Sequence, residues 1–340
     1  MNTKKIKING SFLNSNRALL FLIVVLIAGI FQNNFYTAFN INAVTGNGSL
    51  FIWLGLGFTI CLIAGHMDLT VQYVSTLAAL MCLGLHADQK IPWVLAIIIA
   101  TLVGALVGLI NGILVAKLKI HSFIATLGMQ FVLRGVMYFY SGGAEMSIGS
   151  DYSANEVLTG QLIPVLPFST YFLITTLVII LVMVFMRNTR TGRNIYLVGG
   201  NLETAWLAGV KSDKVTIAVF MLSSTCCALG GALNGIYSGA ANVTMGEKGI
   251  APLMIALTAT IIGGTAISGG AGSVVNTYIT LVAVAFLKAI FVKTEEQVLV
   301  LALILIACIA YETIAQYRKD KVLGTRPNLH LEYLKEKGKI

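Results

Sequence analysis

Few residues in this chain have the types and spacing that catalysis requires. The sequence contains no phosphate-binding G-x-x-x-x-G-K-[ST] loop, no H-E-x-x-H zinc pair and no G-x-S-x-G nucleophile elbow. The five cysteines lie inside apolar stretches without metal-ligand spacing, and the four histidines are far apart in the sequence. We therefore predict that the chain is not an enzyme, and that it holds no metal and no cofactor of its own.

Ionisable side chains inside apolar segments are the next candidates for function, because a charge in the bilayer is costly. Arg134 lies in the middle of segment 122–141, where exposure to lipid would cost at least ~2.5–3.5 kcal/mol. We expect it to face protein or water, either in a structural pair or along a solute route. Asp68 lies at a segment border and either fixes a loop or binds a coupling ion. All 14 acids lie in loops, in tails or at segment ends, which indicates an energy source outside this chain.

The composition excludes the soluble classes of protein. Of 340 residues, 57% are hydrophobic and 11% are charged, against about 25% charged in soluble domains, and the mean hydropathy is +0.85. The net charge of +9 does not indicate a nucleic-acid partner, because the basic residues lie between apolar runs. We predict an all-α polytopic membrane protein whose main partner is the lipid bilayer.

About ten transmembrane helices are expected, since each crossing needs about 20 apolar residues. They form a transmembrane domain over 18–316, between an N-terminal tail (1–17) and a basic C-terminal tail (317–340). The first apolar run is expected to be an uncleaved helix rather than a signal peptide, because no clear cleavage site follows it. The ten predicted segments are 18–36, 49–64, 70–86, 92–116, 122–141, 169–186, 214–238, 250–264, 272–291 and 297–316.

The charge distribution predicts the orientation of these segments. With alternating crossings, 18 of the 23 Lys and Arg residues fall on the side of the two chain ends and 3 fall on the other side. The positive-inside rule therefore predicts cytoplasmic N- and C-termini. It also makes 142–168 an external loop and 187–213 a cytoplasmic loop.

The cytoplasmic loop contains the signals of a short helix. Asn201 can cap its N-terminus, Glu203 lies in its first turn, and Gly209 can end it. Leu202 and Trp206 give this helix an apolar side. The helix either lies on the bilayer surface or docks against another protein.

Glycine-rich connections border several predicted helices. Gly65–Thr70 and Gly263–Gly272 share a G-x-x-x-[LI]-[TS] pattern, which reflects either an internal repeat or chance. Glycines at such positions permit tight turns and close approach of helices.

Four segments together resemble a known family. These are Gly65–Thr70 (GHMDLT), Ser122–Gly143 (SFIATLGMQFVLRGVMYFYSGG), Thr189–Val210 (TRTGRNIYLVGGNLETAWLAGV) and Ile262–Val274 (IGGTAISGGAGSV). They are similar to motifs of the permease subunits of bacterial ATP-binding-cassette (ABC) importers for simple sugars, the group that includes ribose, xylose, galactose and autoinducer-2 permeases. The chain departs from the family at His66, where glycine is common, and in 253–259, which lacks the two usual acids.

This resemblance implies a type II ABC importer-like permease with Gly-rich helix breaks, in the bacterial cytoplasmic (inner) membrane. The expected partners are a separate ATPase subunit that uses ATP and Mg²⁺, an external solute-binding protein, and a second permease copy or paralogue. The short cytoplasmic helix would then sit in a groove of the ATPase. The residues expected to form or shape this coupling loop are Gly192, Arg193, Gly199, Gly200, Asn201, Glu203, Ala205 and Gly209.

The same resemblance and the polar residues near the spans suggest a translocation pathway for a monosaccharide or a similar small polar solute. The alternatives are an ion-coupled secondary transporter, an intramembrane enzyme, and an ABC permease for a non-sugar solute such as an autoinducer, nucleoside or branched-chain amino acid. The residues expected along the pathway are Asp68, Thr70, Gln130, Arg134, Gly263, Gly264, Thr265, Ser268, Gly269 and Gly270.

Overall fold

We describe the protein from a computed structural model, which describes residues 16–245 and 252–291 and scattered residues between 296 and 310. The chain forms two compact units, residues 1–298 and 299–340. All the elements below lie in the first unit. Helices dominate them, as predicted, and the two strands among them have two residues each.

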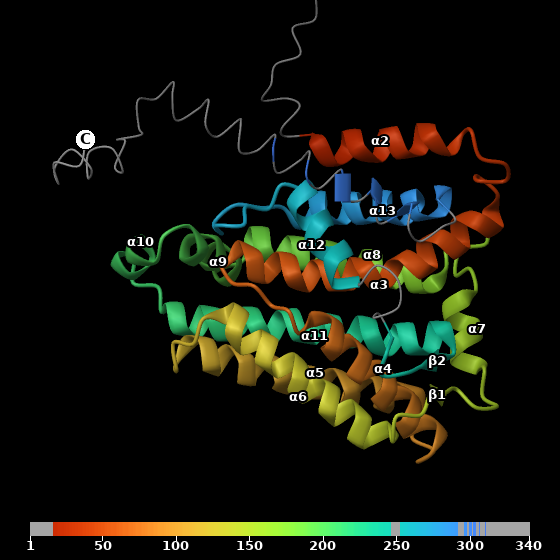
Figure 1. Ribbon diagram of the computed structural model, residues 1–340, viewed down its shortest axis with the longest axis horizontal. Helices are drawn as coiled ribbons and strands as arrows, with labels where there is room; N and C mark the ends of the chain where they lie inside the picture. The colour runs from red at the N-terminus through yellow and green to blue at the C-terminus, as the bar shows by residue number, and fades with distance from the viewer. Residues whose placement is uncertain are drawn as a thin grey trace, which may run out of the picture. The chain divides into compact units, whose positions relative to one another are not determined.

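Figure 1 shows the helices of this unit, which lie side by side in layers, and the few strand residues among them. Strands β1 (Met146–Ser147) and β2 (Ala240–Ala241) pair antiparallel, so that Met146 faces Ala241. The helices are α2 (Arg17–Gly29), α3 (Ala38–Ile63), α4 (Val71–Ala87), α5 (Trp93–Ala116), α6 (Ser122–Ser141), α7 (Ser153–Thr159), α8 (Thr170–Asn188), α9 (Arg190–Gly200), α10 (Leu202–Leu207), α11 (Ser212–Ser238), α12 (Pro252–Ile262) and α13 (Val274–Ile290).

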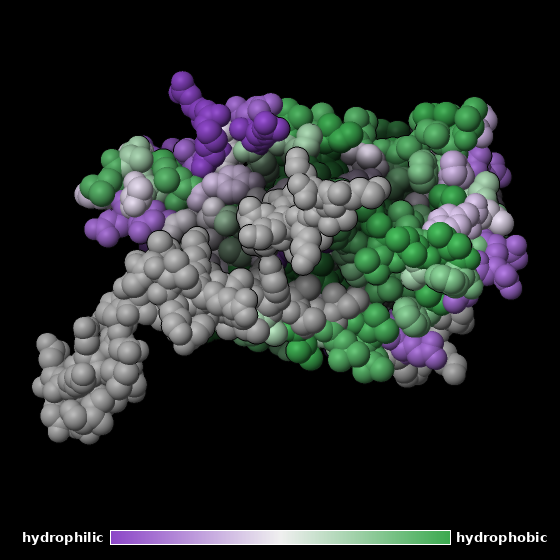
Figure 2. All heavy atoms as spheres, turned by 90° about the horizontal axis from the view of Figure 1, so that it is seen from above, coloured by the Kyte–Doolittle hydropathy of each residue, from purple (hydrophilic) through white to green (hydrophobic). Residues whose placement is uncertain are grey.

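The lengths and surfaces of these helices are those of an integral membrane protein. Within the described residues, α3, α5, α6, α8 and α11 are long and apolar enough to cross a bilayer, and α2, α4, α12 and α13 are shorter apolar helices. Figure 2 shows hydrophobic residues over much of the surface, with hydrophilic residues gathered toward its two ends. The count of ten spans stays a prediction, because most of 297–316 lies outside the described residues.

Helix α11 lies in the core, in contact with α3, α4 and α5. Its contact with α5 is very close because Gly104, Gly108 and Gly112 repeat every fourth residue and face it. A Cβ atom at Gly108 would lie 2.8 Å from Cα of Met221, and one at Gly112 would lie 2.8 Å from Cα of Ile217. Small residues at this spacing let two membrane helices pack backbone to backbone.

Two helix boundaries differ from the predicted ones by more than two residues. Helix α3 begins at Ala38 instead of 49, with the side chain of Thr37 accepting a hydrogen bond from the amide of Asn40 at 3.3 Å. Its first part is rich in asparagine, so hydropathy alone placed the start too late. Helix α2 ends at Gly29, seven residues before the predicted end of its segment.

Candidate functional site

Two helices build the loop between α8 and α11. The sequence did not predict α9, which begins where the Thr189 side chain accepts a hydrogen bond from the amide of Gly192 at 3.0 Å. Helix α10 was predicted: Asn201 caps it by accepting from the amide of Thr204 at 2.9 Å, and Gly209 follows it with φ +75°. The signals read from the sequence for α10 are therefore confirmed.

Helix α10 presents apolar side chains away from the protein. Leu202, Trp206 and Leu207 are 62%, 73% and 73% exposed, and Glu203 is exposed beside them. Ala205 faces inward and is fully buried, so it can shape the helix but cannot itself contact a partner. Trp206 also borders a cavity of about 460 Å³ whose lining includes Lys117, Lys211 and Lys214.

The end of α9 packs directly on two connections that are distant in the sequence. We call the five glycines that meet there, Gly65, Gly199, Gly200, Gly269 and Gly270, the glycine junction. A Cβ atom at Gly269 would lie 2.7 Å from both the carbonyl oxygen of Gly199 and Cα of Gly65. A Cβ at Gly199 would overlap the carbonyl oxygen of Ile63, which accepts a hydrogen bond from the amide of Gly270 at 2.8 Å.

The close packing at the glycine junction has a mechanical consequence. No side chain separates these backbone segments, and the φ angles of Gly65 (+80°), Gly269 (+85°) and Gly270 (+73°) are unfavourable for other residues. Packed backbones transmit displacement with little compression, so a movement of α9–α10 would act on the ends of α3 and α12–α13.

Asp68 fixes the connection between α3 and α4. Its buried carboxylate accepts hydrogen bonds from the amide of Thr70 at 3.0 Å, from the Thr70 hydroxyl, and from Ser223 Oγ of α11 at 3.1 Å. Asn111 Nδ2 of α5 donates to Thr70 Oγ1 at 3.1 Å. These contacts give Asp68 the loop-fixing role, the first of the two interpretations of its position.

Helix α6 is bonded to the backbone of the same connection. Gln130 Nε2 donates to the carbonyl of Leu69 at 2.7 Å, and Thr126 Oγ1 donates to that of Met67 at 3.3 Å. Arg134 lies half-buried one turn beyond Gln130 on this helix. The first four expected pathway residues therefore lie on α6 or in the connection that it touches.

The other expected pathway residues lie in the connection between α12 and α13. Gly263 lies against α13, where a Cβ would be 2.9 Å from the amide of Thr277, and Gly264 lies beside the Arg17 side chain of α2. Thr265 is buried, whereas Ser268 is exposed next to the glycine junction. The structure thus gathers the expected pathway residues around two connections and α6, and their contacts with a solute stay a prediction.

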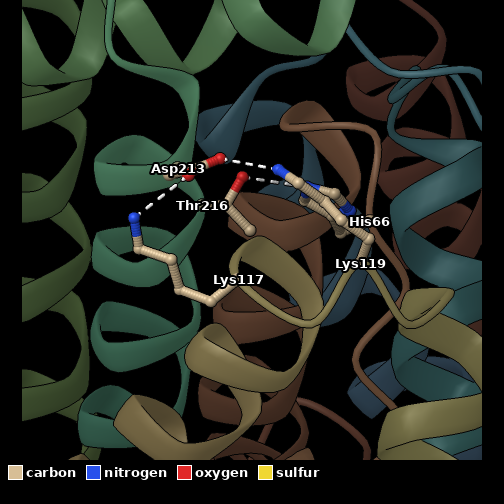
Figure 3. A network of polar contacts seen from close by, with 5 residues as sticks. All are labelled: His66, Lys117, Lys119, Asp213 and Thr216. Atoms are coloured by element: carbon tan, nitrogen blue, oxygen red, sulfur yellow. Dashed lines mark hydrogen bonds and ion pairs between the residues drawn. The ribbon is translucent and has the colours of Figure 1, made fainter.

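Two groups of polar contacts tie α11 to neighbouring connections, one after α5 and one between α3 and α4 (Figure 3). Asp213 pairs with Lys117 Nζ at 3.2 Å and with Lys119 Nζ at 2.8 Å. His66 has a ring nitrogen 3.2 Å from Thr216 Oγ1. Burial, with a smaller contribution from His121, lowers the pKa of His66 to about 4. His66 is therefore neutral at pH 7 and acts here as a packing and hydrogen-bonding group.

The apolar helices of spanning length define an integral membrane protein, and α10 is an exposed apolar helix in the loop between two of them. Residues 40–309 match the family described as branched-chain amino acid transport system / permease component, and the chain belongs to that family. No solved structure matches the chain.

Curated relatives are similar over most of this chain. Ribose import permease protein RbsC of Haemophilus influenzae is 27% identical over 325 residues, which cover 93% of this chain and 96% of the relative. RbsC of Bacillus subtilis is 29% identical, covering 84% and 87%. Autoinducer 2 import system permease protein LsrC of Yersinia pseudotuberculosis is 27% identical, covering 85% and 79%. The predicted resemblance to importer permeases is confirmed.

Proposed function

We propose that this chain is the membrane-spanning subunit of an ATP-driven importer for a monosaccharide or a similar small polar solute. The names of its ribose and autoinducer-2 relatives support this solute class. An external binding protein delivers the solute, and two permease chains, identical or paralogous, form the pathway between them. A separate ATPase hydrolyses ATP with Mg²⁺.

The glycine junction is the observation that carries this proposal. It places α10, the helix with exposed Leu202, Trp206 and Leu207, one short connection away from the ends of the spanning helices. An ATPase that binds α10 and moves it would shift α3 and α12–α13 through packed backbone. ATP and the loaded binding protein then favour different states of the pathway, which is the condition for alternating access.

The orientation follows from the same proposal. Helix α10 faces the cytoplasm of a bacterium, with both chain termini on that side of the inner membrane, and 142–168 faces outward. The bias of 18 against 3 basic residues supports this assignment.

A second solute class has a specific observation in its favour. The description of the matching family names branched-chain amino acid transport, so such an amino acid is the alternative solute of the same importer. Competition by ribose or by leucine for solute uptake separates the two classes.

The test uses proteoliposomes that contain this chain together with its ATPase and its external binding protein. Leu207→Glu places a charge on the exposed side of α10, where Leu207 is 73% exposed. Leu162→Glu is the matched control, because Leu162 is 67% exposed in the loop 142–168. We expect Leu207→Glu to reduce co-purification of the ATPase by about tenfold or more, because charges are depleted at the centre of protein interfaces. Solute uptake should fall to the same extent.

The control should retain the ATPase, and both variants should insert normally. Equal ATPase recovery with both variants would show that α10 does not contact the ATPase. Uptake by the purified chain without ATP or any ATPase would overturn the proposal in favour of an ion-coupled carrier.

A further inference from the structure

A cavity of about 440 Å³ lies between α8, α9 and the first turn of α13, away from the exposed side chains of α10. Its lining combines cationic and aromatic groups with apolar side chains. The residues that matter for its chemistry are Arg187, Arg193, Tyr196, Met183, Met186 and Val275. A cavity with this mixture suits a ligand that is anionic at one end and apolar at the other.

The two arginines are available to a ligand. Arg187 and Arg193 are exposed, and within residues 16–245 and 252–291 no carboxylate pairs with either of them. Arg193 Nη1 donates to the carbonyl of Asn188 at 3.2 Å, which orients its guanidinium and leaves its other N–H groups to donate. Two guanidinium groups on one cavity favour an anion, and their planar forks match phosphate oxygens.

The cavity also lies at the end of α8, a helix long and apolar enough to cross a bilayer. Leu177, Leu181 and Val184 are 57%, 58% and 44% exposed and form one stripe along α8 at helical spacing. Such a stripe faces lipid chains in a membrane helix. Arg187 follows it after one further turn, where the hydrocarbon gives way to headgroups.

The Tyr196 side chain lines the same cavity, close to the two arginines. Its hydroxyl donates to the carbonyl of Gly272 at 3.2 Å and so joins α9 to the connection before α13. Amphipathic aromatic residues are typical of this depth in membrane proteins. Basic pockets between membrane helices bind the headgroups of anionic lipids.

We propose that this cavity binds the phosphate of an anionic phospholipid, with Arg187 and Arg193 on the phosphate and the acyl chains along the 177–184 stripe of α8. The apolar lining and the continuous lipid-facing stripe favour a lipid over free inorganic phosphate. The proposal does not depend on the solute or on the ATPase.

Lipid binding to the purified full-length chain tests the proposal directly. Native mass spectrometry would count bound phosphatidylglycerol and phosphatidylcholine on the wild type and on the double variant Arg187→Ala/Arg193→Ala. We expect the wild type to prefer phosphatidylglycerol and the double variant to lose that preference by about tenfold or more, because charge-assisted hydrogen bonds to phosphate are lost. Arg190→Ala is the matched control, since Arg190 is an exposed arginine of the same loop outside this lining.

Three outcomes would overturn the proposal. One is an equal loss of phosphatidylglycerol in the Arg190→Ala control, which would show general attraction to basic charge. Another is displacement of the bound lipid by millimolar inorganic phosphate, which would show a site for free anions. A third is a folded double variant, with unchanged elution on size exclusion, that keeps its lipid and loses the ATPase instead. The cavity would then belong to a protein contact.

Discussion

Helices α9 and α10 lie at one end of the first unit, and α7 and β1 lie at the other end (Figure 1). A different kind of contact holds the elements together at each end. At the first end the glycine junction brings backbones together with no side chains between them, so that Gly269 lies within van der Waals reach of Gly65 and Gly199. At the second end, three side chains that we call the His86 cluster, His86, Trp93 and Asp151, join α4, α5 and the loop 142–168.

The His86 cluster is held together by contacts between side chains. The His86 ring stacks on Trp93 with centroids 3.6 Å apart, and its Nε2 lies 3.0 Å from Asp151 Oδ2. Trp93 Nε1 donates to the same carboxylate oxygen at 3.2 Å. His86 Nδ1 also lies 2.9 Å from the carbonyl oxygen of Ile91, so both ring nitrogens have polar partners.

The difference shows how the two ends can serve one transporter. Backbone packing is insensitive to pH and salt and suits the transmission of movement. The His86 cluster instead depends on polar side-chain contacts to Asp151, which is 45% exposed, and such partly exposed contacts contribute little stability. Three predictions test this contrast.

The largest expected effect concerns the side of the membrane on which each end lies. In a variant with its native cysteines replaced, Val157→Cys of α7 should react with a membrane-impermeant maleimide on intact cells, because this site is 62% exposed in the proposed external loop. Trp206→Cys of α10 should react only after permeabilisation. Labelling of both cysteines on intact cells would show that both ends lie outside the membrane and would contradict the proposed orientation.

A smaller effect is expected from packing at the glycine junction. Gly199→Ala forces a methyl group against the carbonyl of Ile63, and we expect it to lower the free energy of unfolding by about 1–3 kcal/mol. Gly200→Ala is the control, because its nearest neighbour would be Cα of Gly270 at 3.7 Å, an ordinary contact. Unfolding in detergent measures both variants. Equal stability of the two would show that the junction is not tightly packed in solution.

The smallest effect is expected from the His86 cluster, and it should depend on pH. Hydrogen bonds from Ser153, with smaller contributions from Trp93 and His86, hold the pKa of Asp151 below its usual range. A lowered folded-state pKa gives stability that is present above about pH 4 and lost as pH falls through the folded value. Asp151→Asn should therefore be less stable than the wild type at pH 7 and converge with it in acid. Glu156→Gln, at an exposed carboxylate of the same loop, should match the wild type throughout.

Much of the fold and part of the site follow from local sequence signals. Hydropathy located most of the described spanning helices, and Asn201 and Gly209 marked the ends of α10. Helix α9 was missed because Arg190, Arg193 and three glycines obscure its apolar positions. The signal that could have found it is Thr189 as an N-cap followed by Ile195 and Val198, which are buried on one face.

The site residues that the sequence did not identify all depend on contacts with residues far away in the sequence. Gly65 was recognised as part of a turn, but its contact with Gly269 joins residues about 200 positions apart. Arg187 resembles any basic residue at the end of a span until Tyr196 and the start of α13 enclose a cavity with it. Spacing along one helix contains no information about such contacts.

Local sequence signals are enough to show that the chain enters a membrane, to locate most of its helices, and to identify the loop with a capped apolar helix, because hydropathy, charge and capping are local. Only the folded molecule shows that α9 contacts two remote glycine connections and that two arginines share one cavity. Those contacts arise from the packing of whole helices, in which each small residue matters through the backbone that it allows to approach.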